Sequence, residues 1–71
     1  MAKMDKTMTN LKQKRLDAGM TQAQVAEAAG ISLRSLQDFE QGRHPINKAA
    51  AITVYKLAQV LGCEVADILE L

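Results

Sequence analysis

Two short helical patterns that meet at a single glycine constrain the fold of this chain more than any other feature. The first pattern opens at Thr21, where Thr21-Gln-Ala-Gln24 has the S/T-x-x-E/Q form of a capping box. Gly30 ends this helix, and Ser32 caps a second helix that we expect to continue to about Gln41. The joint between them is only about three residues long, which is the sharp corner that a helix-turn-helix requires.

A further helix is expected before the corner. It begins at Thr9 or Asn10, a suitable N-cap, and ends near Ala18, with Gly19 as a left-handed stop. Its inner face carries Leu11, Arg15 and Ala18 at helical spacing. An arginine on an apolar stripe needs a partner if it is buried.

The segment from Lys48 to Leu61 reads in two ways. The β-branched and aromatic run Ile52-Thr-Val-Tyr55 favours a strand locally. Helical spacing favours a helix, because a set of apolar residues repeats at that period over more than three turns, namely Ala50, Val54, Leu57, Ala58 and Leu61. We therefore predict a helix that Asn47 caps and Gly62 ends.

A last short helix is marked by Val65, Ile68 and Leu69. The expected fold is thus an all-α, compact bundle of about five short helices without strands. Residues 1–8 are expected to form a flexible lead-in, because their charged residues break any apolar stripe, and residues 9–71 to form the domain.

Composition excludes several classes of function. The 71 residues include one cysteine, Cys63, and one histidine, His44, so we expect no disulfide within the chain, no metal site, no cofactor and no enzyme activity. No apolar run has the roughly 20 residues that cross a bilayer, and the N-terminus lacks the apolar core of a signal peptide. We expect a cytoplasmic protein without a membrane partner.

Charge is uneven along the chain although the net charge is only +1. Residues 1–48 hold eight of the nine Lys and Arg, whereas residues 64–70 hold three acids and no base. This distribution predicts one basic face and a neutral to acidic C-terminal end.

The second helix of the corner presents polar side chains suited to the DNA major groove. Its outward positions are Arg34, Gln37, Asp38 and Gln41, with Ser32 and Leu33 at its tip. A guanidinium can bind guanine O6 and N7 bidentately, a glutamine can pair with adenine, and a leucine can contact a thymine methyl. The helix that precedes a recognition helix lies against the DNA backbone.

An ordered set of residues runs through most of the chain, in the order Thr21-Gln22-x-x-Val25-Ala26, Gly30-Ile31-Ser32, Leu36-x-x-Phe39-Glu40-x-Gly42, Pro45 and Leu57-Ala58-x-x-Leu61-Gly62. This set resembles the phage-repressor/Cro-type (xenobiotic-response-element, XRE) helix-turn-helix family over roughly residues 9–70. The resemblance implies a lambda-repressor-like DNA-binding domain.

The resemblance also implies roles for individual residues. It places Ser32, Leu33, Arg34 and Asp38 where the family reads bases, with Gln37 beside them. It places Gln22, and the loop from Arg43 through Asn47 to Lys48, where the family contacts DNA phosphates. It assigns a buried ion pair to Arg15 and Glu40. The chain departs from the family in three ways: the loop and fourth helix are longer than in compact members, Glu64 replaces the usual serine or threonine cap, and an acid stands at position 38.

Simpler interpretations of these residues remain open. Arg34 and Asp38 are four residues apart and can form a surface pair worth a few tenths of a kcal/mol. Leu33 can be a peripheral core residue, Gln22 an ordinary first residue of a helix, and Arg43 and Lys48 part of a solvated loop. Cys63 is expected to be a small apolar filler, and His44 to hydrogen-bond locally.

The sequence therefore predicts a transcriptional regulator of the repressor type that binds double-stranded DNA as a homodimer without a small-molecule effector. The dimer is expected to form through apolar surface at the C-terminal end, which consists of Val65, Ile68, Leu69 and Leu71. One alternative is a protein-interaction module, such as an antitoxin or anti-repressor. A single-stranded nucleic-acid binder is a further one, with only Phe39 and Tyr55 available for stacking.

Overall fold

The computed structural model describes residues 8–71, so the predicted lead-in lies, apart from Met8, outside the described residues. Its elements are α1 (Asn10–Asp17), α2 (Gln22–Ala29), α3 (Leu33–Gln41), a 3-10 helix (Ile46–Lys48), α4 (Ala51–Leu61) and α5 (Val65–Ile68). No strand occurs between residues 8 and 71. The expected all-α fold is confirmed, and within the described chain no helix has the length and apolar character needed to cross a membrane.

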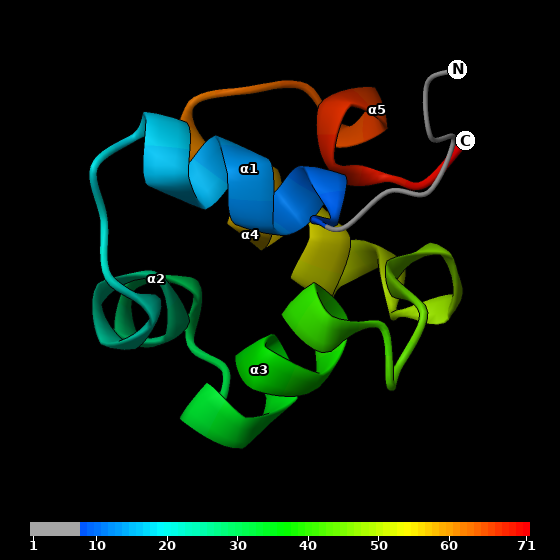
Figure 1. The fold of residues 1–71 in the computed structure, drawn as a ribbon, viewed down its shortest axis with the longest axis horizontal. Helices are drawn as coiled ribbons and strands as arrows, with labels where there is room; N and C mark the ends of the chain where they lie inside the picture. Colours follow the sequence, from blue (N-terminus) through cyan, green and yellow to red (C-terminus); the bar gives the residue numbers. More distant parts are fainter. Residues whose placement is uncertain (1–7) are drawn as a thin grey trace, which may run out of the picture.

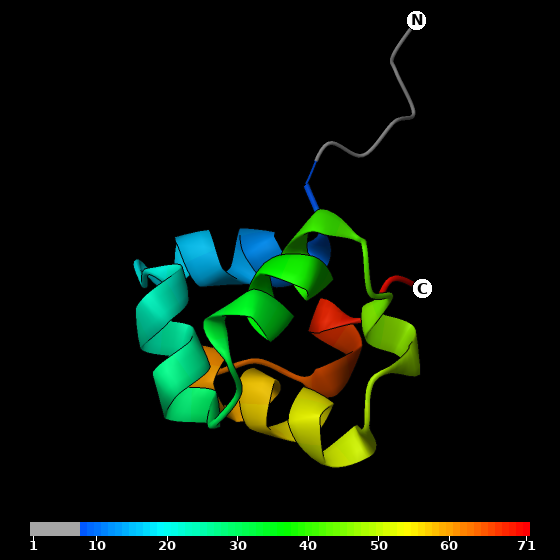
Figure 2. The same ribbon diagram turned by 90° about the horizontal axis from the view of Figure 1, so that it is seen from below.

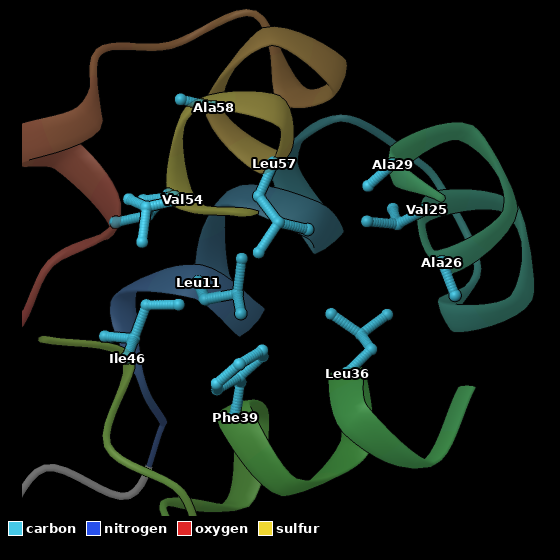
Figure 3. Packing of buried hydrophobic residues seen from close by; sticks show 11 residues of the cluster. Leu11, Val25, Ala26, Ala29, Leu36, Phe39, Ile46, Val54, Leu57 and Ala58 are labelled. Atoms are coloured by element: carbon cyan, nitrogen blue, oxygen red, sulfur yellow. The ribbon is translucent and has the colours of Figure 1, made fainter. Parts of the chain in front are cut away.

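The core lies between the five α-helices. Its largest fully buried side chains come from all five α-helices and are Leu11, Val25, Leu36, Leu57 and Ile68. Figure 3 shows Leu36 and Phe39 of α3 pointing toward Leu11 of α1. Burial of a leucine or phenylalanine side chain stabilises the fold by about 1.5–3 kcal/mol, so these two residues fix α3 by one face.

The opposite face of α3 is not covered by another helix. In Figure 1, α3 lies at the lower edge of the molecule and α5 at the upper edge, with α1 and α4 between them. Figure 2, turned by 90°, shows α3 across the front of the bundle. The fold therefore leaves one side of the second helix of the corner open to a partner.

The start of α4 differs from the sequence prediction. The helix begins at Ala51 with Ala50 as its N-cap, and Ile46–Lys48 forms a separate 3-10 turn. Asn47 is not the cap, because its amide is bonded to the C-terminal tail: Nδ2 donates to Glu70 O, and Oδ1 accepts from Glu70 N, each at 2.8 Å. The run Ile52–Tyr55 is helical, so tertiary packing overrides its local strand preference.

Three residues expected on apolar faces lie elsewhere. Ala18 is the exposed C-cap of α1, and Ala50 is the exposed N-cap of α4, because α1 ends before Ala18 and α4 begins after Ala50. Ile68, predicted to contribute to an apolar surface, is completely buried. The inner face of α5 must be filled because α5 packs on both α1 and α4.

The C-terminal tail is bonded to the start of α1. The backbone N of Asn10 donates to Glu70 Oε2 at 2.6 Å, and Asn10 Nδ2 donates to Leu69 O at 2.8 Å. Glu64 stands where the family has a hydroxyl cap: its backbone N donates to Asp67 Oδ2 at 2.9 Å, and its backbone carbonyl accepts from Asp67 N at 2.9 Å. The carboxylate of Asp67, in the first turn of α5, therefore satisfies the N–H group of the N-cap residue.

Candidate nucleic-acid interface

The corner between α2 and α3 is held by local bonds at each residue. Thr21 and Gln24 form the predicted capping box, with Thr21 Oγ1 accepting from Gln24 N at 3.1 Å and Gln24 Oε1 accepting from Thr21 N at 2.9 Å. Gly30 has φ +73°, which turns the chain, and Ser32 Oγ accepts from Ser35 N at 3.0 Å. The start of α3 is thus fixed in direction before any partner arrives.

The exposed tip of α3 consists of Ser32, Leu33 and Arg34. The Arg34 side chain is 80% exposed, and Leu33 is 44% exposed. Leu33 is therefore not a core residue, and its methyl groups are available to a partner. These side chains stand on a helix whose other face is buried, an arrangement in which the groups can enter a groove without rearrangement of the fold.

A buried ion pair ties α1 to α3. Arg15 Nε donates to Glu40 Oε2 at 2.7 Å, and an Arg15 terminal nitrogen donates to Glu40 Oε1 at 3.1 Å. The second terminal nitrogen donates to the Met20 carbonyl at 2.9 Å. The side chains are only 10% and 1% exposed, and none of the described buried side-chain nitrogens or oxygens lacks a hydrogen bond. The pair is bidentate, which fixes the relative orientation of the two helices as well as neutralising both charges.

Gln22 is the first residue of α2 and is bonded to this pair. Its Nε2 donates to Glu40 Oε1 at 3.1 Å, and its Oε1 accepts from Gln37 Nε2 at 3.4 Å. Both glutamines are half-buried. The Gln37 amide, predicted to read a base, is directed toward Gln22, so the structure brings a predicted phosphate residue and a predicted base residue together.

Asp38 lies between two arginines. Its Oδ1 is 3.0 Å from Arg43 Nε and 3.5 Å from Arg34 Nε, and the Asp38 side chain is 26% exposed. The backbone carbonyl of Asp38 also accepts from His44 N at 3.2 Å. One carboxylate therefore connects the outward face of α3 to the loop that follows it.

The loop after α3 holds the remaining predicted phosphate residues. Arg43 and Lys48 are exposed, with the Arg43 side chain at 57%. The Asn47 amide is engaged by the backbone of Glu70 through both of its polar groups, so it has a structural task that the sequence did not reveal.

His44, in the loop after α3, packs on an aromatic ring, whereas Cys63, which follows α4, is partly buried. The His44 ring packs on Phe39 with ring centroids 4.8 Å apart. Burial raises the pKa of the Cys63 thiol, and the carboxylate of Asp67 adds to the increase. A thiol whose pKa is raised is a poor nucleophile at neutral pH. Among residues 8–71, no group of three or more His, Cys, Asp or Glu could hold a metal ion.

Sequence reasoning missed the connections among these side chains. The Gln22 to Glu40, Arg43 to Asp38 and Asn47 to Glu70 contacts span 18, 5 and 23 residues. Only the five-residue contact could have been suspected from the sequence, because an acid near the end of a helix lies within reach of the basic residue that follows it.

Comparison with known proteins gives a consistent result. The family model described as "Helix-turn-helix" matches residues 11–68. The fold is similar to that of the restriction-modification controller protein C.AhdI from Aeromonas hydrophila, with a TM-score of 0.74 and 22% sequence identity over 83% of this chain and 85% of that chain. It is also similar to the clp gene regulator ClgR from C. glutamicum, with a TM-score of 0.72 and 30% identity over 83% of this chain and 73% of that chain. The search of curated sequences gave no significant match.

Proposed function

Because the chain belongs to the XRE-type helix-turn-helix family of DNA-binding transcriptional regulators, we propose that it represses transcription by placing the start of α3 in the major groove of duplex DNA. The observation that carries the proposal is the exposed tip of α3 on a fixed corner. The groove is about 12 Å wide and accepts one helix. The Arg34 side chain is 80% exposed at this tip, and we assign it the main base contact.

Phosphate contacts position the protein on the duplex, and we assign them chiefly to Gln22, Arg43 and Lys48. Gln22 stands at the N-terminus of α2, where free backbone N–H groups attract a phosphate oxygen. Arg43 directly follows the C-cap of α3, and Lys48 ends the 3-10 helix that precedes α4; both residues are exposed. Asn47 is retained as a weaker candidate, because a phosphate would compete with its bonds to Glu70.

The protein is proposed to act as a homodimer on two half-sites about 34 Å apart, since one reading helix contacts few bases. The large apolar side chains that α4 and the C-terminal end leave exposed are Ile52, Tyr55, Val65 and Leu71. These residues supply the surface that a second copy would cover, in place of the buried Ile68.

Selection of bound sites from random duplexes tests the proposal. Arg34→Ala is expected to lose preference at one base position, because a guanidinium that contacts a base edge carries sequence information. Gln22→Ala is expected to weaken all sites about equally, because a phosphate contact carries none.

The measurement is site enrichment followed by titration of the best site at several salt concentrations. Lys12→Ala on α1 is the matched control for loss of a cation outside the corner. Absence of any enriched site would overturn the assignment. Weak and salt-insensitive association would favour the protein-interaction alternative, since DNA affinity falls steeply with salt.

A further inference from the structure

We propose that Asp38 lowers sequence-independent DNA binding by holding the guanidinium groups of Arg34 and Arg43, and thereby sharpens sequence preference. The inference rests on the proposed function and assigns to Asp38 a role other than the base contact expected from sequence. Asp38 acts through the two arginines and through its own charge, so it is a specificity-determining residue that need not contact a base.

The geometry places a single carboxylate oxygen against both arginines. Asp38 Oδ1 is 3.0 Å from Arg43 Nε and 3.5 Å from Arg34 Nε. Arg34 comes from the first turn of α3 and Arg43 from the loop beyond its end, so the two cations approach Asp38 from opposite ends of the helix. An oxygen engaged in this way has less capacity left to accept from a cytosine amino group.

Electrostatics then opposes contact with phosphate at any sequence. A phosphate that binds Arg34 or Arg43 must compete with the bond to Asp38, and the carboxylate itself repels the duplex. The cost is the same for every sequence, whereas a good bidentate base contact by Arg34 offsets it only at the correct site. Exposed ion pairs are individually worth little, so both arginines remain available when that site is presented.

The buried acid of α3 does not share this role. Glu40 is also on α3, but its carboxylate is occupied by Arg15 and Gln22 and is 1% exposed. Asp38 is therefore the carboxylate of α3 that a duplex would meet.

Binding of the full chain to a random-sequence duplex and to its selected best site, at several salt concentrations, tests the inference. Asp38→Asn and Asp38→Ala are both needed, because an asparagine can itself pair with adenine. Asp17→Asn is the matched control: it makes the same change in net charge on α1, where Asp17 accepts from Gln13 at 2.9 Å. Circular dichroism establishes that each variant is folded.

Both Asp38 variants are expected to bind the random duplex about three- to tenfold more tightly. The slope of the logarithm of the binding constant against the logarithm of the salt concentration should become steeper by about one for each arginine that gains a phosphate contact. The ratio of best-site to random affinity should fall, and Asp17→Asn should change none of these values. An equal gain in Asp17→Asn would overturn the inference, as would loss of preference at one base position without tighter random binding. Failure of the unaltered chain to bind any duplex would overturn the proposed function and this inference with it.

Discussion

At the scale of single residues, the Arg15–Glu40 pair fixes the orientation of α3 relative to α1. Both side chains are almost completely buried, and Glu40 also accepts from Gln22. A buried ion pair is often no more stabilising than apolar side chains of the same volume, whereas a single buried charge without a partner is costly. The pair therefore serves orientation: it sets the angle of α3 and holds the Gln22 amide at the end of α2.

Arg15→Met is expected to destabilise the protein by about 3–5 kcal/mol, because it leaves the Glu40 carboxylate buried without its cation. The double variant Arg15→Met/Glu40→Leu should recover much of that loss. Its DNA affinity should nevertheless stay below that of the unaltered chain, because Gln22 has lost its anchor. Urea denaturation gives the stabilities and duplex titration the affinities; a double variant as unstable as Arg15→Met would contradict the orientation role.

At the scale of elements, the turn before α3 illustrates how local chemistry fixes direction. Gly30 adopts φ +73°, and a Cβ placed on it would meet nothing within 4 Å. The requirement for glycine at this position is therefore backbone conformation and not space.

Gly30→Ala is expected to cost about 1–2 kcal/mol, the penalty of the left-handed conformation for a residue with a Cβ. Gly30→Asn should cost less, because asparagine tolerates this conformation better. Equilibrium unfolding measures both. An alanine variant as stable as the unaltered chain would mean that the corner can be made with another backbone conformation, which would weaken the case for a fixed presentation of α3.

Elements could be predicted from sequence where the signal was local. Thr21, Ser32 and the left-handed glycines define the ends of α2 and α3, and the structure confirms them. The start of α4 was misplaced because Asn47 has a partner 23 residues away, which a cap rule cannot see. The burial of Ile68 likewise depends on how α5 packs on α1 and α4.

The candidate site was predictable only in part for the same reason. The residue types at the tip of α3 indicated groove chemistry, and the exposure of Arg34 is compatible with it. The sequence could not reveal that Gln37 is bonded to Gln22, or that Asp38 is shared by two arginines, because side-chain partners are set by helix packing.

At the scale of the whole molecule, the proposed dimer depends on apolar side chains that the monomer leaves exposed. Ile52 and Tyr55 are 59% and 51% exposed on successive turns of α4, and Leu71 is 93% exposed. Covering exposed apolar groups of this kind with a second copy removes them from water and so stabilises the dimer.

Serine substitutions at Ile52 with Tyr55, and at Val65 with Leu71, test this surface. At least one of the two double variants is expected to sediment as a monomer. That variant should bind a duplex with two half-sites at least about tenfold more weakly, which is a loss of about 1.4 kcal/mol of binding free energy. Leu16→Ser, on α1 with Leu16 46% exposed, is the control and should remain dimeric. A monomeric unaltered chain, or dimers of all three variants, would contradict this surface.

The contact between Asn10 and Glu70 has a consequence for chain connectivity. Residues 60 positions apart are adjacent in space, so the helices form a nearly closed circuit. Circular permutation joins the two chain ends and opens new ends in an exposed turn, and domains tolerate it where their ends lie close together. We therefore expect a chain that begins at another exposed turn to pack its helices into the same bundle.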